Sequence, residues 1–259
     1  MGTDTMKQLA HLAAALKTPR IIDCAARLAA QATASHWAYE EYLAAVLERE
    51  ASARDSSGAA LRIRGAGFDS RKTLDDFDFD LQPALRGPIA QLASGAWLSE
   101  GRNIVLLGPP GTGKTHLATG LGIKACHQGR RVLFATATDW VTRLTDAHRA
   151  GRLPAELTRL ARYHLIIIDE VGYLPFGQDA ANLFFQLVSS RYEHASLILT
   201  SNLAFSAWGA VFGDQAVAAA MIDRIVHHAD VLALKGNSYR LRDRDIDPLP
   251  SIKAQNEAD

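Results

Sequence analysis

A glycine-rich stretch near the middle of the chain has the residue types and spacing of an anion-binding loop. In GPPGTGKT the pattern G-x-x-x-x-G-K-[ST] is met by Gly108, Gly113, Lys114 and Thr115. Glycines let the backbone curl so that successive N–H groups point inward and form a nest for phosphate oxygens. The pattern predicts binding of ATP by a continuous run: Gly108, Pro109, Pro110, Gly111, Thr112, Gly113, Lys114, Thr115 and His116.

The residues on either side of this loop fit a strand followed by a helix. NIVLL (103–107) is a short apolar run typical of a buried strand, and Leu117 and Leu121 recur beyond the loop at helical spacing. A helix starting at the loop adds unpaired N–H groups and its positive dipole end. Lys114 can then reach the β- and γ-phosphates, and the Thr115 hydroxyl can bind Mg²⁺. A chance glycine-rich turn would lack this combination.

Two adjacent acids, Asp169 and Glu170, close another apolar run, LIIIDE. They resemble a Walker B motif, in which the first acid holds the Mg²⁺ shell and the second polarises the attacking water. Acids are common where strands end, but here they follow the loop by one strand–helix unit, which favours the catalytic interpretation. The second acid is typical of ring ATPases and is usually missing from kinases and GTPase switches.

Three further polar residues are candidates for contacts with the γ-phosphate. Asn202 ends LILTSN, a strand expected between the loop strand and the Walker B strand, and fits the sensor 1 position of AAA+ ATPases; the alternative is an Asn that starts a turn. Arg224 lies on an apolar helix and is a candidate arginine finger acting in trans; the alternative is a local pair with Asp223. Arg240 is a weaker candidate for a second phosphate sensor, or a surface arginine beside Tyr239.

Length and composition set bounds on the class of protein. The 259 residues include 28 basic and 28 acidic side chains, so net charge neither supports nor excludes nucleic acid, because a local patch is sufficient for phosphate contacts. No apolar run approaches the ~18 residues of a membrane span, and the start of the chain lacks a signal-peptide core. We therefore expect a cytoplasmic protein without a membrane partner. Cys24 and Cys126 have no metal or redox spacing.

The pattern along the chain predicts two regions. Residues 1–65 are expected to form a small all-helical domain, in which Tyr39, Leu43, Val46 and Leu47 follow one helical stripe. Residues 66–82 read as a linker with aromatic residues that dock onto a neighbouring surface, and 246–259 as a disordered tail. Between them, 83–245 alternates helices with five apolar runs. That alternation predicts an α/β domain, a parallel sheet covered by helices on both faces.

These motifs together resemble the IstB-like ATPases, transposition helper proteins of a bacterial insertion-sequence family within AAA+ and relatives of the DnaC helicase loaders. The resemblance is carried by GPPGTGKTHLA, LIIIDEVGYLP, RYEHASLILTSN, IDRIVHHA and GNSYRLR, and by YEEYLAAVLERE, RIRGAGF and KTLDDFDF nearer the start, over residues 8 to 244. It implies an AAA+ P-loop sheet of strand order 5-1-4-3-2. It also implies a DNA-stimulated, Mg²⁺-dependent ATPase that oligomerises on double-stranded DNA, remodels it and recruits a transposase, with no nuclease or strand-transfer chemistry of its own.

DNA contacts are expected to reach phosphates and not base edges, since no recognition-helix signature is present. Two groups of basic side chains are candidates, each with a solvated surface as the alternative. They are Arg49, Arg54, Arg62 and Arg64 after the first helices, and Arg143, His148, Arg149 and Arg152 before the Walker B strand.

Two other functions compete with the transposition helper. A helicase loader of the DnaC type would share the ATPase motifs, but the GYLPFG loop and the N-terminal match favour the helper. A metabolic P-loop kinase would need a substrate lid and a phosphate-acceptor site, and the sequence indicates neither.

Overall fold

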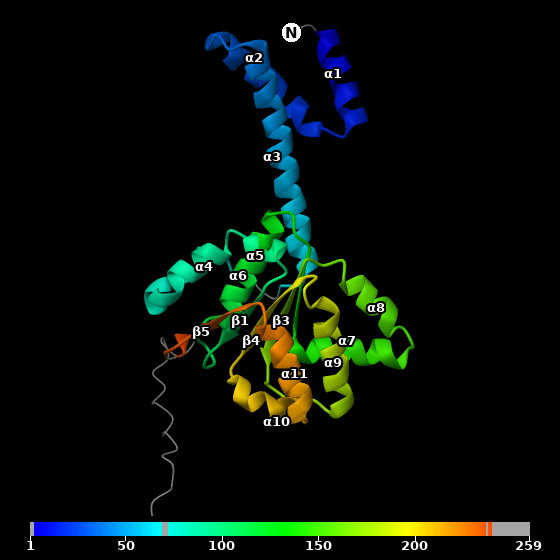
Figure 1. The fold of residues 1–259 in the computed structure, drawn as a ribbon. Coiled ribbons are helices and arrows are strands. Elements are labelled where there is room, and N and C mark those ends of the chain that lie inside the picture. The colour runs from blue at the N-terminus through cyan, green and yellow to red at the C-terminus, as the bar shows by residue number, and fades with distance from the viewer. Residues whose placement is uncertain (1–2, 69–71, 237, 240–259) are drawn as a thin grey trace, which may run out of the picture.

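The computed structural model describes residues 3–68, 72–236 and 238–239, and its core is a five-stranded parallel sheet (Figure 1). The strand order is β2-β3-β4-β1-β5, with every neighbouring pair parallel. The strands are β1 (Asn103–Leu107), β2 (Val132–Thr136), β3 (Leu165–Val171), β4 (Ser196–Ser201) and β5 (Ala229–Ala233). Read from the other edge this is the predicted order 5-1-4-3-2, so the predicted α/β sheet is confirmed.

Helices cover both faces of the sheet, as parallel strands require. Side chains alternate along each strand: in β3, Ile166 and Ile168 join the core on one face, while Leu165 and Ile167 join the core on the other. One face packs on α7 (Ala137–Arg149), α8 (Leu153–Leu160), α9 (Gln178–Arg191), α10 (Trp208–Phe212) and α11 (Gln215–Val226). The other packs on α4 (Arg86–Leu92), α5 (Ala96–Ser99), α6 (Lys114–His127) and the end of α3. Three 3₁₀ turns span Phe79–Leu81, Pro83–Leu85 and Phe205–Ala207.

The N-terminal region consists of α1 (Thr3–Leu16), α2 (Pro19–Ala34) and α3 (Tyr39–Ala66). Figure 1 shows α3 as a long stalk, with α1 and α2 at its far end. Its last turns pack on the sheet domain, because Ala66 belongs to the core on one face of the sheet and the Arg62 Nε donates a hydrogen bond of 2.7 Å to the Cys126 carbonyl. One helix therefore joins the two regions.

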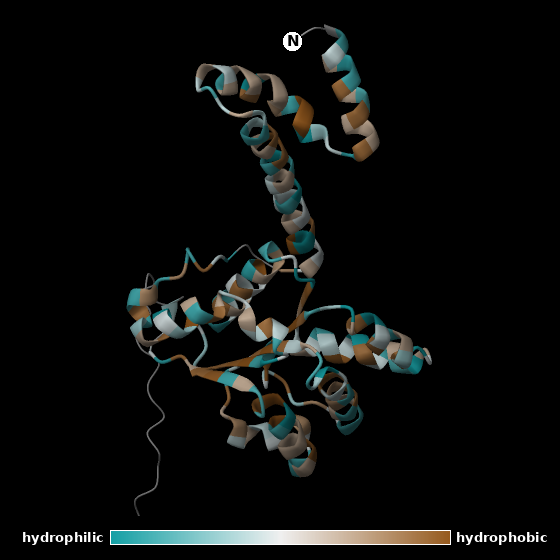
Figure 2. Cartoon of the chain, turned by 45° about the horizontal axis from the view of Figure 1, so that its top comes forward, coloured by the Kyte–Doolittle hydropathy of each residue, from teal (hydrophilic) through white to brown (hydrophobic). Residues whose placement is uncertain are grey.

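The apolar stripe expected on this helix is only partly covered. Val46 is buried against Cys24 and Leu28 of α2, but Tyr39, Leu43 and Leu47 are each more than half exposed. Hydropathy colouring makes the contrast visible: the strands are mostly hydrophobic, whereas α3 changes colour from turn to turn (Figure 2).

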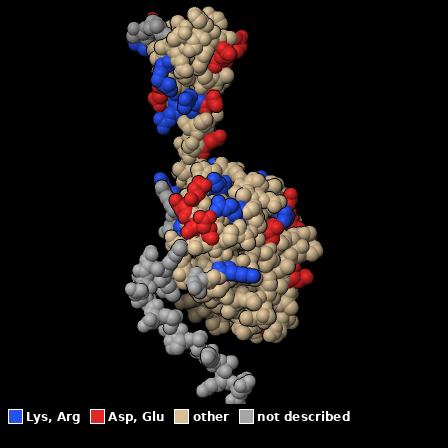
Figure 3. All heavy atoms as spheres, turned by 90° about the vertical axis from the view of Figure 1, so that its left-hand side faces the viewer, with Lys and Arg blue, Asp and Glu red and all other residues tan. Residues whose placement is uncertain are grey.

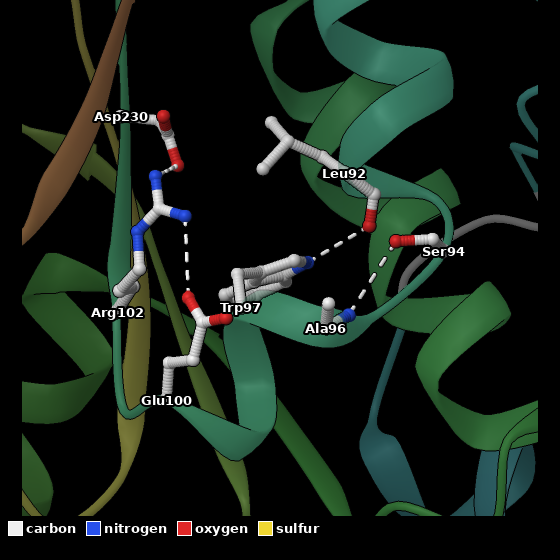
Figure 4. A network of polar contacts seen from close by, with 7 residues as sticks. All are labelled: Leu92, Ser94, Ala96, Trp97, Glu100, Arg102 and Asp230. Atoms are coloured by element: carbon white, nitrogen blue, oxygen red, sulfur yellow. Dashed lines mark hydrogen bonds and ion pairs between the residues drawn. The ribbon is translucent and has the colours of Figure 1, made fainter.

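Polar contacts fasten α5 to the edge strand β5 (Figure 4). The Arg102 guanidinium donates to Asp230 at 2.6 Å and to Glu100 at 3.3 Å, and the buried Trp97 indole N–H donates to the Leu92 carbonyl at 2.8 Å. These bonds hold the segment that leads into β1, and so the strand that carries the phosphate loop.

Within the described ranges, no helix combines the length and the hydrophobicity needed to cross a membrane. The predicted disordered tail, 246–259, lies outside the described residues, as does Arg240.

Candidate nucleotide-binding site

The glycine-rich loop connects the carboxyl end of β1 to the first turn of α6, which begins at Lys114. Gly108 has a φ of +152°, and a Cβ there would collide with the Leu234 carbonyl at the end of β5. Gly113, the N-cap of α6, has a φ of +99°. Both positions need glycine for this geometry. The loop thus presents backbone N–H groups at a helix N-terminus, a site suited to phosphate.

Lys114 is buried beneath this loop, and its Nζ donates to the carbonyls of Gly108 and Pro109, both at 2.7 Å. The ammonium therefore already lies beside the backbone that would surround the phosphates. Thr112 tightens the same turn by donating from its hydroxyl to the Pro109 carbonyl at 2.8 Å.

Oxygen atoms suited to Mg²⁺ meet between the loop and the neighbouring strand. The Thr115 hydroxyl donates to the Asp169 carboxylate at 3.1 Å. Two adjacent oxygens on one Mg²⁺ ion lie about 2.9 Å apart, given metal–oxygen distances of about 2.0–2.1 Å. The distance between the Thr115 and Asp169 oxygens is therefore compatible with both side chains binding one ion, and their role as Mg²⁺ ligands stays a prediction. Mg²⁺ there would neutralise phosphate charge, while these two side chains hold its position.

A β-bulge gives Asp169 and Glu170 different surroundings. Ile168 pairs with Leu199 and Val171 with Ser201, so Asp169 and Glu170 together lie opposite Thr200. Glu170 has a φ of +61°, an uncommon conformation for a residue other than glycine. Asp169 is buried whereas Glu170 is exposed. The bulge thus leaves the second acid exposed to water, and its role in polarising a nucleophile stays a prediction.

Thr200 holds this bulge and was missed by the sequence reasoning. Its hydroxyl donates to the Asp169 carboxylate at 2.6 Å and accepts the Glu170 backbone N–H at 2.9 Å. A threonine on the strand beside a Walker B motif was the available signal, but the sequence did not show the shift in register that brings it opposite both acids.

The two remaining described candidates differ in their surroundings. Asn202 is exposed directly after β4, at the same carboxyl edge as Glu170. Arg224 is half-buried on α11, and its guanidinium carbon lies 4.5 Å from the centre of the Phe185 ring. No carboxylate of a described residue, Asp223 included, lies within ion-pair distance of Arg224. The Phe185 ring, and not a carboxylate, is therefore the contact that positions the Arg224 side chain.

The aromatic linker docks on the loop helix. Phe77 packs against Gly113 and makes an edge-to-face contact with His116, with ring centres 5.3 Å apart, and the His116 Nε2 lies 2.7 Å from the Thr73 carbonyl. Hydrogen bonds from the Thr73 hydroxyl and backbone N–H lower the pKa of Asp76, which closes the turn. This segment, between α3 and the ATPase core, is thus in contact with the phosphate loop.

The basic candidates for DNA contact fall into two sets. Side chains of the first set contact the protein itself: Arg54 with Glu50, Arg62 with the Cys126 carbonyl, and Arg143 with Glu156. The second set is exposed, and none of its members forms an ion pair with another described residue; it consists of Arg49, Arg64, His148, Arg149 and Arg152.

Comparison with known proteins shows the family to which this chain belongs. The model of the IstB-like ATP binding protein family matches residues 11–246. A protein of Pseudomonas aeruginosa described as an ATP-binding protein of insertion sequence IS21 is 41% identical over 240 residues, covering 92% of this chain and 91% of that one. One of Geobacillus stearothermophilus, described for insertion sequence IS5376, is 39% identical over 218 residues, covering 84% and 87%.

Solved structures with the same fold are AAA+ proteins of replication initiation. DnaA from Aquifex aeolicus bound to AMPPCP superposes with a TM-score of 0.55 at 20% identity, covering 68% of this chain and 54% of that one. A DnaC helicase loader superposes with a TM-score of 0.52 at 22% identity, covering 67% and 99%. At these identities the likeness establishes the fold alone. With the family match over almost the whole length, the chain is a member of the IstB-like ATP-binding proteins, with an AAA+ fold.

Proposed function

We propose that this chain is the ATP-dependent helper of a transposase: ATP-bound copies assemble on duplex DNA, remodel it and recruit the transposase. The observation that carries the proposal is a complete phosphate loop and Walker B pair in a chain that matches insertion-sequence ATP-binding proteins along nine-tenths of its length. The helper controls assembly through ATP and leaves DNA cutting and joining to the transposase.

In this proposal, side chains at the carboxyl edge of the sheet each perform one task in ATP hydrolysis. Lys114 binds the phosphates, and Thr115 and Asp169 hold Mg²⁺. Glu170 polarises the attacking water, and Asn202 senses the γ-phosphate. Each of these residues lies on, or directly after, β1, β3 or β4 or at the start of α6, so one copy contributes them all.

Arg224 supplies the missing positive charge from a neighbouring copy. It is half-buried on Phe185 and has no carboxylate partner among the described residues. Such an arginine raises phosphoryl transfer by roughly 10³–10⁵-fold when it reaches the transition state. Hydrolysis then depends on assembly, and this makes ATP turnover a signal of the assembled state.

Duplex DNA contacts the exposed basic set through its phosphates. Arg49 and Arg64 both lie on α3, about 22 Å apart along the axis and within about 60° of each other around it. Figure 3 shows basic side chains gathered on the N-terminal helices above the narrow stalk. Arg149 and Arg152 lie at the end of α7 and just after it, on the ATPase domain.

A helicase loader is the alternative, because the AAA+ part superposes on a DnaC loader. That superposition covers 67% of this chain, and the relatives that match nearly all of it are insertion-sequence proteins. A loader would be stimulated by single-stranded DNA and would bind a replicative helicase.

The deciding measurement is the ATPase rate without DNA, with a mixed-sequence duplex and with single strands, each in the presence and absence of a transposase from the same class of insertion sequence. Duplex stimulation together with transposase binding is expected. Stimulation by single strands alone would support the loader, and an absence of DNA response would contradict both.

Phosphate contact adds a quantitative requirement. The logarithm of duplex affinity should fall linearly with the logarithm of salt concentration, with a slope of about −0.9 per neutralised phosphate. Replacing Arg49 and Arg64 with Gln should reduce that slope and weaken all duplexes alike. Arg130→Gln is the matched control, since its guanidinium donates to the Ser99 hydroxyl. A salt-insensitive or sequence-restricted affinity would exclude binding through phosphates.

A further inference from the structure

Two histidines and a glutamate converge at the edge of the sheet opposite the nucleotide site. Glu193 lies in the turn between α9 and β4, and His227 and His228 lie between α11 and β5, so all three precede strands whose carboxyl ends adjoin the phosphate loop. One ligand atom from each of the three exposed side chains lies within 4.8 Å of the other two. No other group of three metal-ligating side chains meets this spacing among the described residues.

We propose that Glu193, His227 and His228 form a binding site for a divalent transition-metal ion of the Zn²⁺ class. In a tetrahedral zinc site with ligand distances of about 2.0–2.2 Å, neighbouring ligand atoms lie about 3.3 Å apart. The His228 Nε2 and a Glu193 carboxylate oxygen are already 3.8 Å apart. Exposed side chains need only small rotations to close the difference. Two imidazoles select zinc-like metals over Mg²⁺ and Ca²⁺, and a water would complete the coordination.

His227 is held by a neighbour in the way that metal-binding histidines commonly are. Its Nδ1 lies 2.6 Å from the Tyr192 hydroxyl, and the two rings stack with centres 5.9 Å apart. When Nδ1–H donates to that hydroxyl, Nε2 keeps its lone pair for a metal. Tyr192 therefore holds the ring orientation, and the tautomer with a proton on Nδ1 is the one that leaves Nε2 available for a metal.

Buried Asn103 connects the two segments that supply the ligands. Its backbone N–H donates to the His228 carbonyl at 2.7 Å, and its side-chain amide donates to the Ile225 carbonyl at 3.0 Å. Its side-chain oxygen accepts the Leu197 N–H at 2.9 Å. The backbone on both sides of the site is thus fixed before any ion binds, which lowers the entropic cost of binding.

The local electrostatics favour a cation. Helices α9 and α11 both end here, at Arg191 and Val226, and direct the negative ends of their dipoles toward the cluster. A bound ion would fasten the C-terminal end of α11, one turn after Arg224, to the α9–β4 turn.

Metal titration of the tag-free, chelator-treated full chain tests this site. Co²⁺ serves as the optical probe, without nucleotide and with excess Mg²⁺ to occupy all-oxygen sites. One Co²⁺ per chain should give ligand-field absorption that one equivalent of Zn²⁺ abolishes. Absence of saturable binding by the wild-type chain would overturn the proposal.

Variants then locate the ion. His228→Ala and Glu193→Gln should weaken Zn²⁺ binding by at least tenfold, and Tyr192→Phe by roughly 10-fold through loss of ring orientation. His194→Ala, in the same turn but outside the cluster, should bind as the wild type does. Equal affinity in the ligand variants, or an equal loss in His194→Ala, would show that the ion binds elsewhere.

Amide hydrogen exchange on the wild-type chain gives a readout that needs no variant to fold. Zn²⁺ should slow exchange at residues 192–194 and 225–228. Protection that is confined to the phosphate loop and β3 would assign the ion to the Walker acids and contradict the proposed site.

Discussion

The ATPase domain and the N-terminal helices bury apolar surface to very different extents. Both faces of the sheet are covered by large clusters of buried apolar side chains, and the cluster on one face includes fully buried Trp140 and Trp208. In the N-terminal helices the buried cluster consists of Cys24, Leu28 and Val46. The ATPase domain therefore has a core that can hold a strained catalytic bulge in place. The small N-terminal cluster contributes less to the stability of its own helices, so these helices depend more on the contact of α3 with the ATPase domain.

The two regions also carry different kinds of candidate functional residues. Every described residue of the nucleotide site lies in the ATPase domain, whereas two of the exposed arginines proposed to contact DNA lie on α3. If the regions are this distinct, a change in one should leave the measured property of the other intact. The end of α3, bonded to α6 through Arg62, and the linker turn around Phe77, docked on His116, are two contacts through which they would communicate.

The largest effect is expected from Arg224→Ala. This variant should lower ATP turnover by the assembled protein by roughly 10³-fold or more, while a single copy still binds ATP. Lys114→Ala should lose tight ATP binding because the charge beside the phosphates is removed. Mixing the two variants should partly restore activity, since each supplies what the other lacks. Turnover is measured over a range of mixing ratios. A mixture that stays inactive at every ratio would make Arg224 a structural residue.

Glu170→Gln should lower turnover by roughly 10²–10⁴-fold because an amide cannot take a proton from water. ATP binding should persist, and the variant should accumulate on DNA in the ATP-bound state. Single-turnover hydrolysis and a filter-binding assay measure the two properties. Wild-type hydrolysis by this variant would remove Glu170 from catalysis, and a loss of DNA binding would contradict the separation of the two regions.

The contribution of each core to stability can be compared by replacing one buried leucine with alanine in each region. Leu121→Ala, on α6, should destabilise the ATPase domain by about 2–5 kcal/mol, since Leu121 is almost fully buried. Leu28→Ala, on α2, should cost less, because its cluster is small and can collapse around the missing atoms. Chemical denaturation followed by circular dichroism gives both values. Equal losses would contradict the expectation that the small N-terminal cluster collapses around the missing atoms more readily than the core of the ATPase domain.

How far the sequence predicts the molecule depends on whether local pattern or tertiary contact decides the feature. The sheet follows from short apolar runs, because strands buried on both faces consist mostly of apolar residues, and the phosphate loop follows from its glycines. The exposure of Tyr39 and Leu43 did not follow, since periodicity identifies an apolar face but not what covers it.

Long helices and register shifts limit prediction for a related reason. Nothing in the pattern of α3 marks the point at which it leaves the N-terminal cluster and packs on α6, so the contact of Arg62 with the Cys126 carbonyl could not be foreseen. Likewise, the bulge that brings Thr200 opposite both Walker acids is a property of two strands together.

The smallest predicted effects come from one buried polar residue in each region. Thr200→Val keeps the shape of the side chain but removes the hydroxyl that donates to Asp169 and accepts from the Glu170 N–H. Losing these bonds should cost about 1–3 kcal/mol, most of it in positioning the acids. We expect turnover about tenfold lower, with Mg²⁺ affinity reduced and ATP affinity nearly unchanged.

Glu50→Gln is the matched change in the N-terminal helices. The Glu50 carboxylate accepts the Arg20 backbone N–H at 2.9 Å and pairs with Arg54 at 3.3 Å. The amide oxygen can still accept from the backbone, but the charge is lost, so the helices should loosen slightly while turnover stays at the wild-type rate. Hydrogen exchange of α2 and steady-state ATPase measurements test the pair of variants. A fall in turnover with Glu50→Gln would show that the N-terminal helices act on the nucleotide site without DNA, because neither residue contacted by Glu50 belongs to that site.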